Sequence, residues 1–240
     1  MTDITPAETG EASAASVAES AAKPGFDRSA YTVLLFDLDG TVLDTRDLIL
    51  ASYHYACEKV LGYRLPDEPL LDLIGVPLTE QMRLLVEADK VDEMVIAYRE
   101  HNALGHDTYI NYFAGTHEAL QELGAAGWRK AIVTSKRTDS AKQGLDSFNL
   151  TGYFETIVGY DMTERHKPDA EPLLFAARLM RVDPTRCVYV GDSPYDMQAA
   201  TAAGCFAVGA TWGFFDAERL LNAGAQILVN NIADLPGVLA

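Results

Sequence analysis

Leu34-Leu35-Phe36-Asp37-Leu38-Asp39-Gly40-Thr41 is the most informative segment of this 240-residue chain. The apolar run Val33 to Phe36 predicts a buried strand, and Asp37 and Asp39 follow it in the loop at its carboxyl end. Carboxylates with this spacing can share a hard cation, and magnesium prefers oxygen ligands that leave room for a substrate phosphate. Gly40 frees the loop backbone to fold around such a cation. The segment predicts a magnesium site at a strand end, although the same letters alone also fit a solvated turn.

Three later segments extend this pattern. Ala131 to Ser135 is a second apolar strand that ends in hydroxyls, His166 to Asp169 places a lysine before a helix, and Val188 to Asp196 is a third strand that ends in acids. Ligands of an open parallel sheet bind beyond the carboxyl ends of its strands, so these segments are expected to converge. The sequence therefore predicts a single site to which all of them contribute.

Strands and helices alternate from Arg129 onward, which is typical of right-handed βαβ units. We therefore predict an α/β fold with a Rossmann-like, doubly wound parallel sheet. The predicted strands after the first are residues 130–134, 156–159, 187–191 and 206–210, and the predicted helices between them are residues 138–148, 169–180 and 195–203.

The segment between Thr45 and Gly115 has helical periodicity without apolar strand runs, for example at Leu48, Ser52 and Ala56. Residues 46–115 are therefore predicted to be a helical insertion. The flanking residues 30–45 and 116–240 are predicted to form one α/β core. Residues 1–29 lack a basic start and a continuous apolar run, so they are predicted to be a disordered tail and not a secretory signal.

The composition excludes several classes of function. A net charge of −16 argues against nucleic-acid binding, which needs basic surfaces. No apolar run reaches the roughly 18 residues of a membrane span. Cys57, Cys187 and Cys205 lack the Cys-x-x-Cys spacing of metal sites and are odd in number, so we expect reduced, buried thiols in a cytoplasmic protein.

The four segments, in this order, resemble the motifs of the haloacid dehalogenase (HAD) superfamily. The resemblance covers about residues 33 to 235. It implies that the insertion after the first motif is a small helical cap, which closes over the active site and selects the substrate while the core carries the reaction. It also implies a magnesium cofactor.

Within this resemblance, Asp37 is the predicted nucleophile, which would form an aspartyl phosphate. Magnesium is expected at Asp37, Asp39 and Asp192, with Asp39 contributing through the Leu38 to Asp39 backbone. The Asp39 side chain would then be available as general acid to the leaving oxygen and as general base to the attacking water.

The remaining predicted site residues bind phosphate or orient other groups. The Thr134 hydroxyl and the backbone amides of Ser135 and Lys136 would bind phosphoryl oxygens. Lys167 is the cation expected to pair with Asp37 and the phosphate. Asp196 would orient either a metal-bound water or Lys167.

The leading functional prediction is a magnesium-dependent phosphatase that resembles phosphoglycolate phosphatases and hydrolyses a small phosphomonoester. An inorganic pyrophosphatase of the same architecture is the main alternative, in which Lys136 and Arg137 would hold the leaving phosphate. A phosphosugar mutase and a catalytically silent scaffold are less favoured, the latter because the predicted site residues are all present.

Overall fold

A computed structural model describes residues 26–240 of the chain. Most of the tail predicted at residues 1–29 lies outside these residues. Its last part is described: Phe26 stacks on Tyr31 at a ring distance of 5.2 Å and meets Phe206 edge-on. Residues 26–29 therefore lie against the folded body of the protein.

Six parallel strands form the central sheet, in the order β5-β4-β1-β6-β7-β8. The strands are β1 (Val33–Phe36), β4 (Arg129–Val133), β5 (Thr156–Val158), β6 (Cys187–Gly191), β7 (Phe206–Ala210) and β8 (Ile227–Val229). The chain builds the sheet outward from β1 in both directions, which creates a topological switch point beside β1. The predicted α/β fold class is confirmed. Strand β8, at one edge of the sheet, was not predicted.

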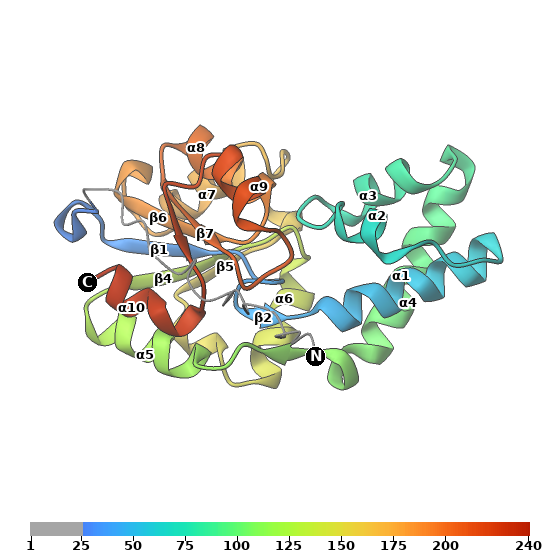
Figure 1. Cartoon of the computed structure of the whole chain (residues 1–240), viewed down its shortest axis with the longest axis horizontal. Coiled ribbons are helices and arrows are strands. Elements are labelled where there is room, and N and C mark those ends of the chain that lie inside the picture. The colour runs from blue at the N-terminus through green and yellow to red at the C-terminus, as the bar shows by residue number, and fades with distance from the viewer. Residues whose placement is uncertain (1–25) are drawn as a thin grey trace, which may run out of the picture.

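Helices cover both faces of the sheet (Figure 1). One face carries α7 (Glu171–Leu179), α8 (Pro194–Ala203) and α9 (Ala217–Asn222), and the other carries α5 (Thr116–Ala125), α6 (Thr138–Ser147) and α10 (Leu235–Val238). Side chains alternate along β1, so Val33 and Leu35 face the first layer whereas Leu34 and Phe36 face the second. All four are fully buried, which explains the continuous apolar run in the sequence.

Four helices form a separate layer beside the core (Figure 1). They are α1 (Arg46–Leu61), α2 (Asp67–Leu71), α3 (Leu78–Leu85) and α4 (Val91–Tyr109). The antiparallel strands β2 (Leu43–Asp44) and β3 (Asn111–Tyr112) pair where the chain leaves and re-enters the core. The helical insertion predicted at residues 46–115 coincides with these helices, and we call this layer the cap. Its boundaries as a domain stay a prediction.

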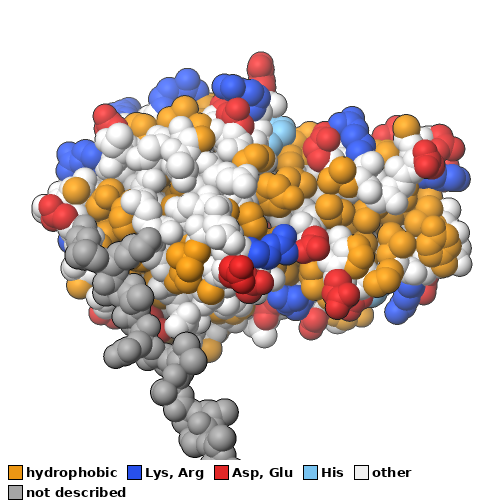
Figure 2. Space-filling model, turned by 45° about the horizontal axis from the view of Figure 1, so that its top comes forward, with side chains coloured by type: hydrophobic (Ala, Val, Ile, Leu, Met, Phe, Trp, Pro, Cys, Tyr) orange, Lys and Arg blue, Asp and Glu red, His pale blue; other side chains and the backbone are white. Residues whose placement is uncertain are grey.

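Short 3₁₀ helices connect several of these elements. They are η1 (Arg28–Ala30), η2 (Ala88–Lys90), η3 (Thr151–Tyr153), η4 (Tyr160–Met162), η5 (Pro184–Arg186) and η6 (Ile232–Asp234). Within residues 26–240, no helix combines the length and apolarity needed to cross a bilayer. On the face shown in Figure 2, Lys and Arg side chains are scattered among Asp and Glu and do not form a basic stripe.

Gly159 gives a test of how tightly the core packs at the end of β5. A methyl group there would lie 2.4 Å from the backbone nitrogen of Thr138, which begins α6 and cannot move independently. We expect Gly159→Ala to lower the free energy of unfolding by about 1–3 kcal/mol, the usual cost of overpacking. Urea denaturation would measure this loss. Gly152→Ala is the matched control, because a methyl group at Gly152 meets no atom within 4 Å; equal stability of the two variants would contradict the packing seen here.

Candidate active site

Lys167 lies between two buried carboxylates at the carboxyl end of the sheet. Its Nζ is 2.8 Å from Oδ1 of Asp37 and 2.6 Å from Oδ1 of Asp196, and all three residues are at most 5% exposed. The hydroxyl of Tyr189 lies 3.2 Å from the same ammonium. Burial alone would lower the pKa of Lys167, but Asp196 and Asp37 outweigh burial and raise it. The lysine is therefore charged, and it holds the Asp37 carboxylate in a fixed orientation.

Asp196 is oriented by its own helix. It is the third residue of α8, and it forms a capping box in which Oδ2 accepts hydrogen bonds from the backbone nitrogen and hydroxyl of Ser193 at 3.0 and 2.6 Å. Its other oxygen, Oδ1, accepts from Lys167 and lies 2.9 Å from the Tyr189 hydroxyl. Because both oxygens are occupied in this way, the geometry favours the predicted role of Asp196 in orienting Lys167.

Asp192 follows β6 and is fixed by two neutral donors. The Thr41 hydroxyl donates to Oδ1 at 3.0 Å, and the backbone nitrogen of Phe214 donates to Oδ2 at 2.8 Å. The backbone also approaches this carboxylate closely. A methyl group at Gly40 or Gly213 would lie 2.3 Å from an Asp192 side-chain oxygen. Both positions therefore require glycine, and Gly40 in addition has a left-handed φ of 79°.

Asp37, Asp192 and Asp196 form a buried acidic cluster in which one oxygen of each lies within 4.8 Å of the others. The pKa of Asp37 is raised to about 7, mainly by burial; Lys167 opposes this rise and Asp196 adds to it. Burial, Asp196 and Asp37 also raise the pKa of Asp192. Buried carboxylates that repel one another favour a hard divalent cation with oxygen ligands. The donor set therefore fits magnesium, with Asp37 and Asp192 as the carboxylates best placed to hold it.

Asp39 lies apart from this cluster. Its Oδ1 is 3.0 Å from Nζ of Lys136, and both side chains are largely buried. The Thr134 hydroxyl accepts a hydrogen bond from the backbone nitrogen of Lys136 at 3.2 Å, which leaves its own proton available to a substrate oxygen. The Ser135 hydroxyl instead donates to the carbonyl oxygen of Gly75 in the cap, at 2.7 Å. The predicted phosphate-binding part of Ser135 is accordingly its backbone amide.

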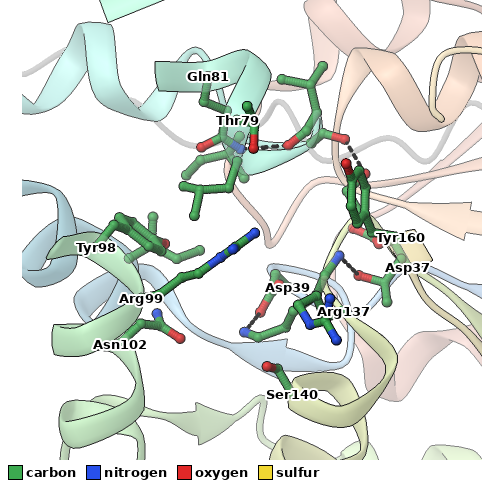
Figure 3. A pocket seen from close by; sticks show the side chains of 18 of the residues that line it. Asp37, Asp39, Thr79, Gln81, Tyr98, Arg99, Asn102, Arg137, Ser140 and Tyr160 are labelled. Atoms are coloured by element: carbon green, nitrogen blue, oxygen red, sulfur yellow. Dashed lines mark hydrogen bonds and ion pairs between the residues drawn. The ribbon is translucent and has the colours of Figure 1, made fainter. Parts of the chain in front are cut away.

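A cavity of about 330 Å³ opens between these residues and the cap (Figure 3). Asp37, Asp39, Thr134 and Lys167 line its core side. The cap side includes residues that no sequence motif identified: Thr79 and Gln81 from α3, and Tyr98, Arg99 and Asn102 from α4. Figure 3 shows the Arg99 guanidinium directed into the cavity from the cap. The cavity therefore joins the acidic and basic side chains at the end of the core sheet to a distinct set of cap side chains.

Comparison with known proteins identifies the family. The profile of haloacid dehalogenase-like hydrolases matches residues 34–210. The chain belongs to this family. The PpaX protein of Caldanaerobacter subterraneus is 40% identical over 189 residues, which cover 79% of this chain and 86% of the relative. Pyrophosphatase PpaX of Bacillus velezensis is 34% identical over 85% of this chain and 94% of the relative.

Solved structures share the fold of this HAD hydrolase. The haloacid dehalogenase-like protein SP0104 of Streptococcus pneumoniae superposes with a TM-score of 0.80 at 24% identity, covering 88% of this chain and all of that one. A predicted phosphoglycolate phosphatase of Haemophilus somnus has a TM-score of 0.79 at 21% identity, covering 88% of this chain and 99% of that one. At these identities the likeness establishes the fold.

The residues predicted for the site of this HAD hydrolase lie at the carboxyl end of its sheet. Asp37, Lys167 and Asp192 converge with Asp196, and the cavity is lined by Asp37 and Lys167 together with Asp39, Thr134 and Ser135. The sequence did not identify Tyr189, although its hydroxyl contacts Lys167 and Asp196. Its position inside a buried strand, where a hydroxyl needs a partner, is the signal that could have found it.

Magnesium binding by this HAD hydrolase can be tested without a substrate. We expect Mg²⁺ to stabilise the protein by about 2.7 kcal/mol when its free concentration is 100 times Kd, because it relieves repulsion between buried carboxylates. Thermal denaturation with Mg²⁺ and with chelator would measure this effect. Asp192→Asn should abolish the response, whereas Asp89→Asn, an exposed change in the cap, should retain it. An unchanged response in Asp192→Asn would exclude Asp192 as a ligand.

Proposed function

We propose that this protein is a magnesium-dependent phosphohydrolase whose preferred substrate is inorganic pyrophosphate. The observation that carries the proposal is the charge around the cavity. Its lining contains two carboxylates, Asp37 and Asp39, and four cations, which are Lys136, Lys167, Arg99 and Arg137. In a chain of net charge −16, this concentration of cations favours a substrate with two adjacent anionic groups.

The relatives support the same substrate. The Bacillus velezensis relative is named a pyrophosphatase, and the chain spans nearly all of it. Pyrophosphate is also small enough for a cavity of about 330 Å³. The phosphoglycolate-like monoester predicted from the sequence is the second candidate, because a carboxylate could occupy the position of the second phosphate.

In the first proposed step, an Asp37 oxygen attacks one phosphorus atom while the bond from that phosphorus to the bridging oxygen breaks. Lys167 orients Asp37 and balances its charge as the aspartyl phosphate forms. The Thr134 hydroxyl and the amides after it can donate to the phosphoryl oxygens. Magnesium held by Asp37, the Leu38 to Asp39 backbone and Asp192 would supply additional charge neutralisation at the nucleophile and the phosphoryl group.

Asp39 is the proposed general acid and base. In the first step it would protonate the bridging oxygen as the leaving phosphate departs, and in the second it would take a proton from the water that hydrolyses the aspartyl phosphate. Nζ of Lys136 lies 3.0 Å from Oδ1 of Asp39, so its ammonium would be close to the leaving oxygen that Asp39 protonates. This arrangement makes Lys136 the residue best placed to bind the leaving phosphate.

A substrate panel tests the proposal. Phosphate release would be measured with pyrophosphate, phosphoglycolate, sugar phosphates and an aryl phosphate, each with Mg²⁺ and with chelator. We expect the highest kcat/KM for pyrophosphate. With chelator present, we expect no phosphate release from any of the substrates. Asp37→Asn should abolish turnover while the protein stays folded by circular dichroism, because the nucleophile is removed. Preference for phosphoglycolate would select the second candidate, and activity in Asp37→Asn would overturn the assigned nucleophile.

Arg99 should contribute binding energy from the cap. Loss of one charge-assisted contact to a phosphate costs about 1.5–3 kcal/mol, so Arg99→Gln is expected to raise KM for pyrophosphate by about 10-fold or more. The same change should affect an aryl phosphate little, since that substrate has no second anion. Arg64→Gln, at an exposed cap arginine paired with Glu58, is the control. An equal rise in KM for both substrates would show that Arg99 does not bind the second phosphate.

A further inference from the structure

We propose that Gln81 and Tyr53, inside the cap, are positioning residues for the phosphate-binding loop of the core. They act through residues 72–76, which join α2 to α3 and which we call the docking loop. The proposal deepens the proposed function, because the loop that receives this contact is the one assigned to phosphate. Neither residue belongs to a motif recognised in the sequence.

The docking loop contacts the phosphate-binding loop directly. The Ser135 hydroxyl donates a 2.7 Å hydrogen bond to the carbonyl oxygen of Gly75. Ser135 stands between Thr134 and Lys136, whose side chains line the cavity. A shift of the docking loop would therefore move Ser135 through this one short hydrogen bond. The backbone amides of Ser135 and Lys136, which are proposed to face the substrate, would move with it.

The docking loop also contacts the loop that carries Asp192. Gly75 has a φ of 110°, and a methyl group on it would lie 2.8 Å from both Oγ of Ser193 and Cδ2 of Tyr195. Ser193 follows Asp192 and caps α8. The glycine thus permits a close approach to two loops of the active site at once. An exposed ion pair between Asp72 and Arg219 adds a third contact with the core, of small energy.

Inside the cap, two hydrogen bonds fix the position of the docking loop. Nε2 of Gln81 donates to the carbonyl oxygen of Val76 at 2.6 Å, and Oε1 of Gln81 accepts from the hydroxyl of Tyr53. Tyr53 is fully buried in α1 and packs edge-on against Tyr98, a cavity residue. Gln81 and Tyr53 therefore fix the position of Val76. Because Gly75 is the neighbouring residue in the chain, they also fix its carbonyl oxygen where Ser135 donates to it.

This chain of contacts explains why a polar glutamine lines the apolar wall of the cavity made by Ile74, Val76 and Leu78. Gln81 uses both ends of its amide within the protein, on Tyr53 and on Val76. A direct contact of Gln81 with the substrate is the competing explanation. The two explanations differ in whether the effect of Gln81 depends on Ser135.

A double-mutant cycle separates these explanations. Gln81→Leu and Ser135→Ala should each lower kcat/KM for the best substrate by about 10-fold, the size expected for one lost buried hydrogen bond. If both act through the docking loop, the double variant should be little worse than either single variant. Effects that multiply to about 100-fold would show independent roles and overturn the proposal. Tyr53→Phe, which removes only a hydroxyl, should give a smaller loss in the same direction.

Hydrogen exchange measured without substrate keeps this test separate from that of the proposed function. Amides of residues 72–76 should exchange faster in Gln81→Leu and Ser135→Ala than in the wild-type protein, since each variant removes one attachment of the docking loop. Gln121→Leu, an exposed change on α5, is the matched control and should match the wild type. Unchanged amide exchange rates in both variants would overturn the proposal that these residues fix the docking loop. Absence of phosphate release by the wild-type enzyme would instead refute the proposed function and leave the exchange result valid.

Discussion

The ion pairs of Lys167 with Asp37 and Asp196 impose the strictest constraint on this structure. Three ionisable side chains are almost fully buried, and removal of Lys167 would leave two carboxylates without their counter-charge in a medium of low polarity. Each comes from a different part of the chain: the end of β1, the loop before α7 and the start of α8. The arrangement therefore requires that β1 and β6 be paired in the correct register before the charges can meet.

Tyr189 extends this constraint across the sheet. Its hydroxyl lies 2.9 Å from both Asp196 Oδ1 and the carbonyl oxygen of Val133, at the end of β4. The next residue, Thr134, continues the ladder with a hydrogen bond to the Val158 carbonyl oxygen. The charged centre and the proposed phosphate-binding loop are thus attached to the same rigid strand ends. Such attachment holds a proposed nucleophile and its anion-binding groups in fixed relation before the substrate arrives.

The sequence predicted the strands of the core closely but did not identify the cap residues that line the cavity, for physical reasons. Strands buried on both faces leave apolar runs that can be read directly, and the observed β1, β6 and β7 have the predicted bounds. Charged residues at their ends stand out against those runs. In the cap, Arg99 and Gln81 lie on amphipathic helices where polar residues are expected anyway. The role of the Thr41 hydroxyl is equally hard to predict. Its partner Asp192 is 151 residues away in sequence, and no local sequence pattern indicates that contact.

Ser135 shows why a correct position in the sequence does not determine a role. Its place after an apolar strand predicts a phosphate contact for its backbone amide, and its hydroxyl donates to Gly75 of the cap. The side chain of Ser135 therefore binds the cap, while a phosphate contact of its backbone amide stays a prediction. This hydrogen bond joins cap and core, so the cap closure expected from the sequence would form it in the same step that brings the proposed phosphate-binding amides against the cap.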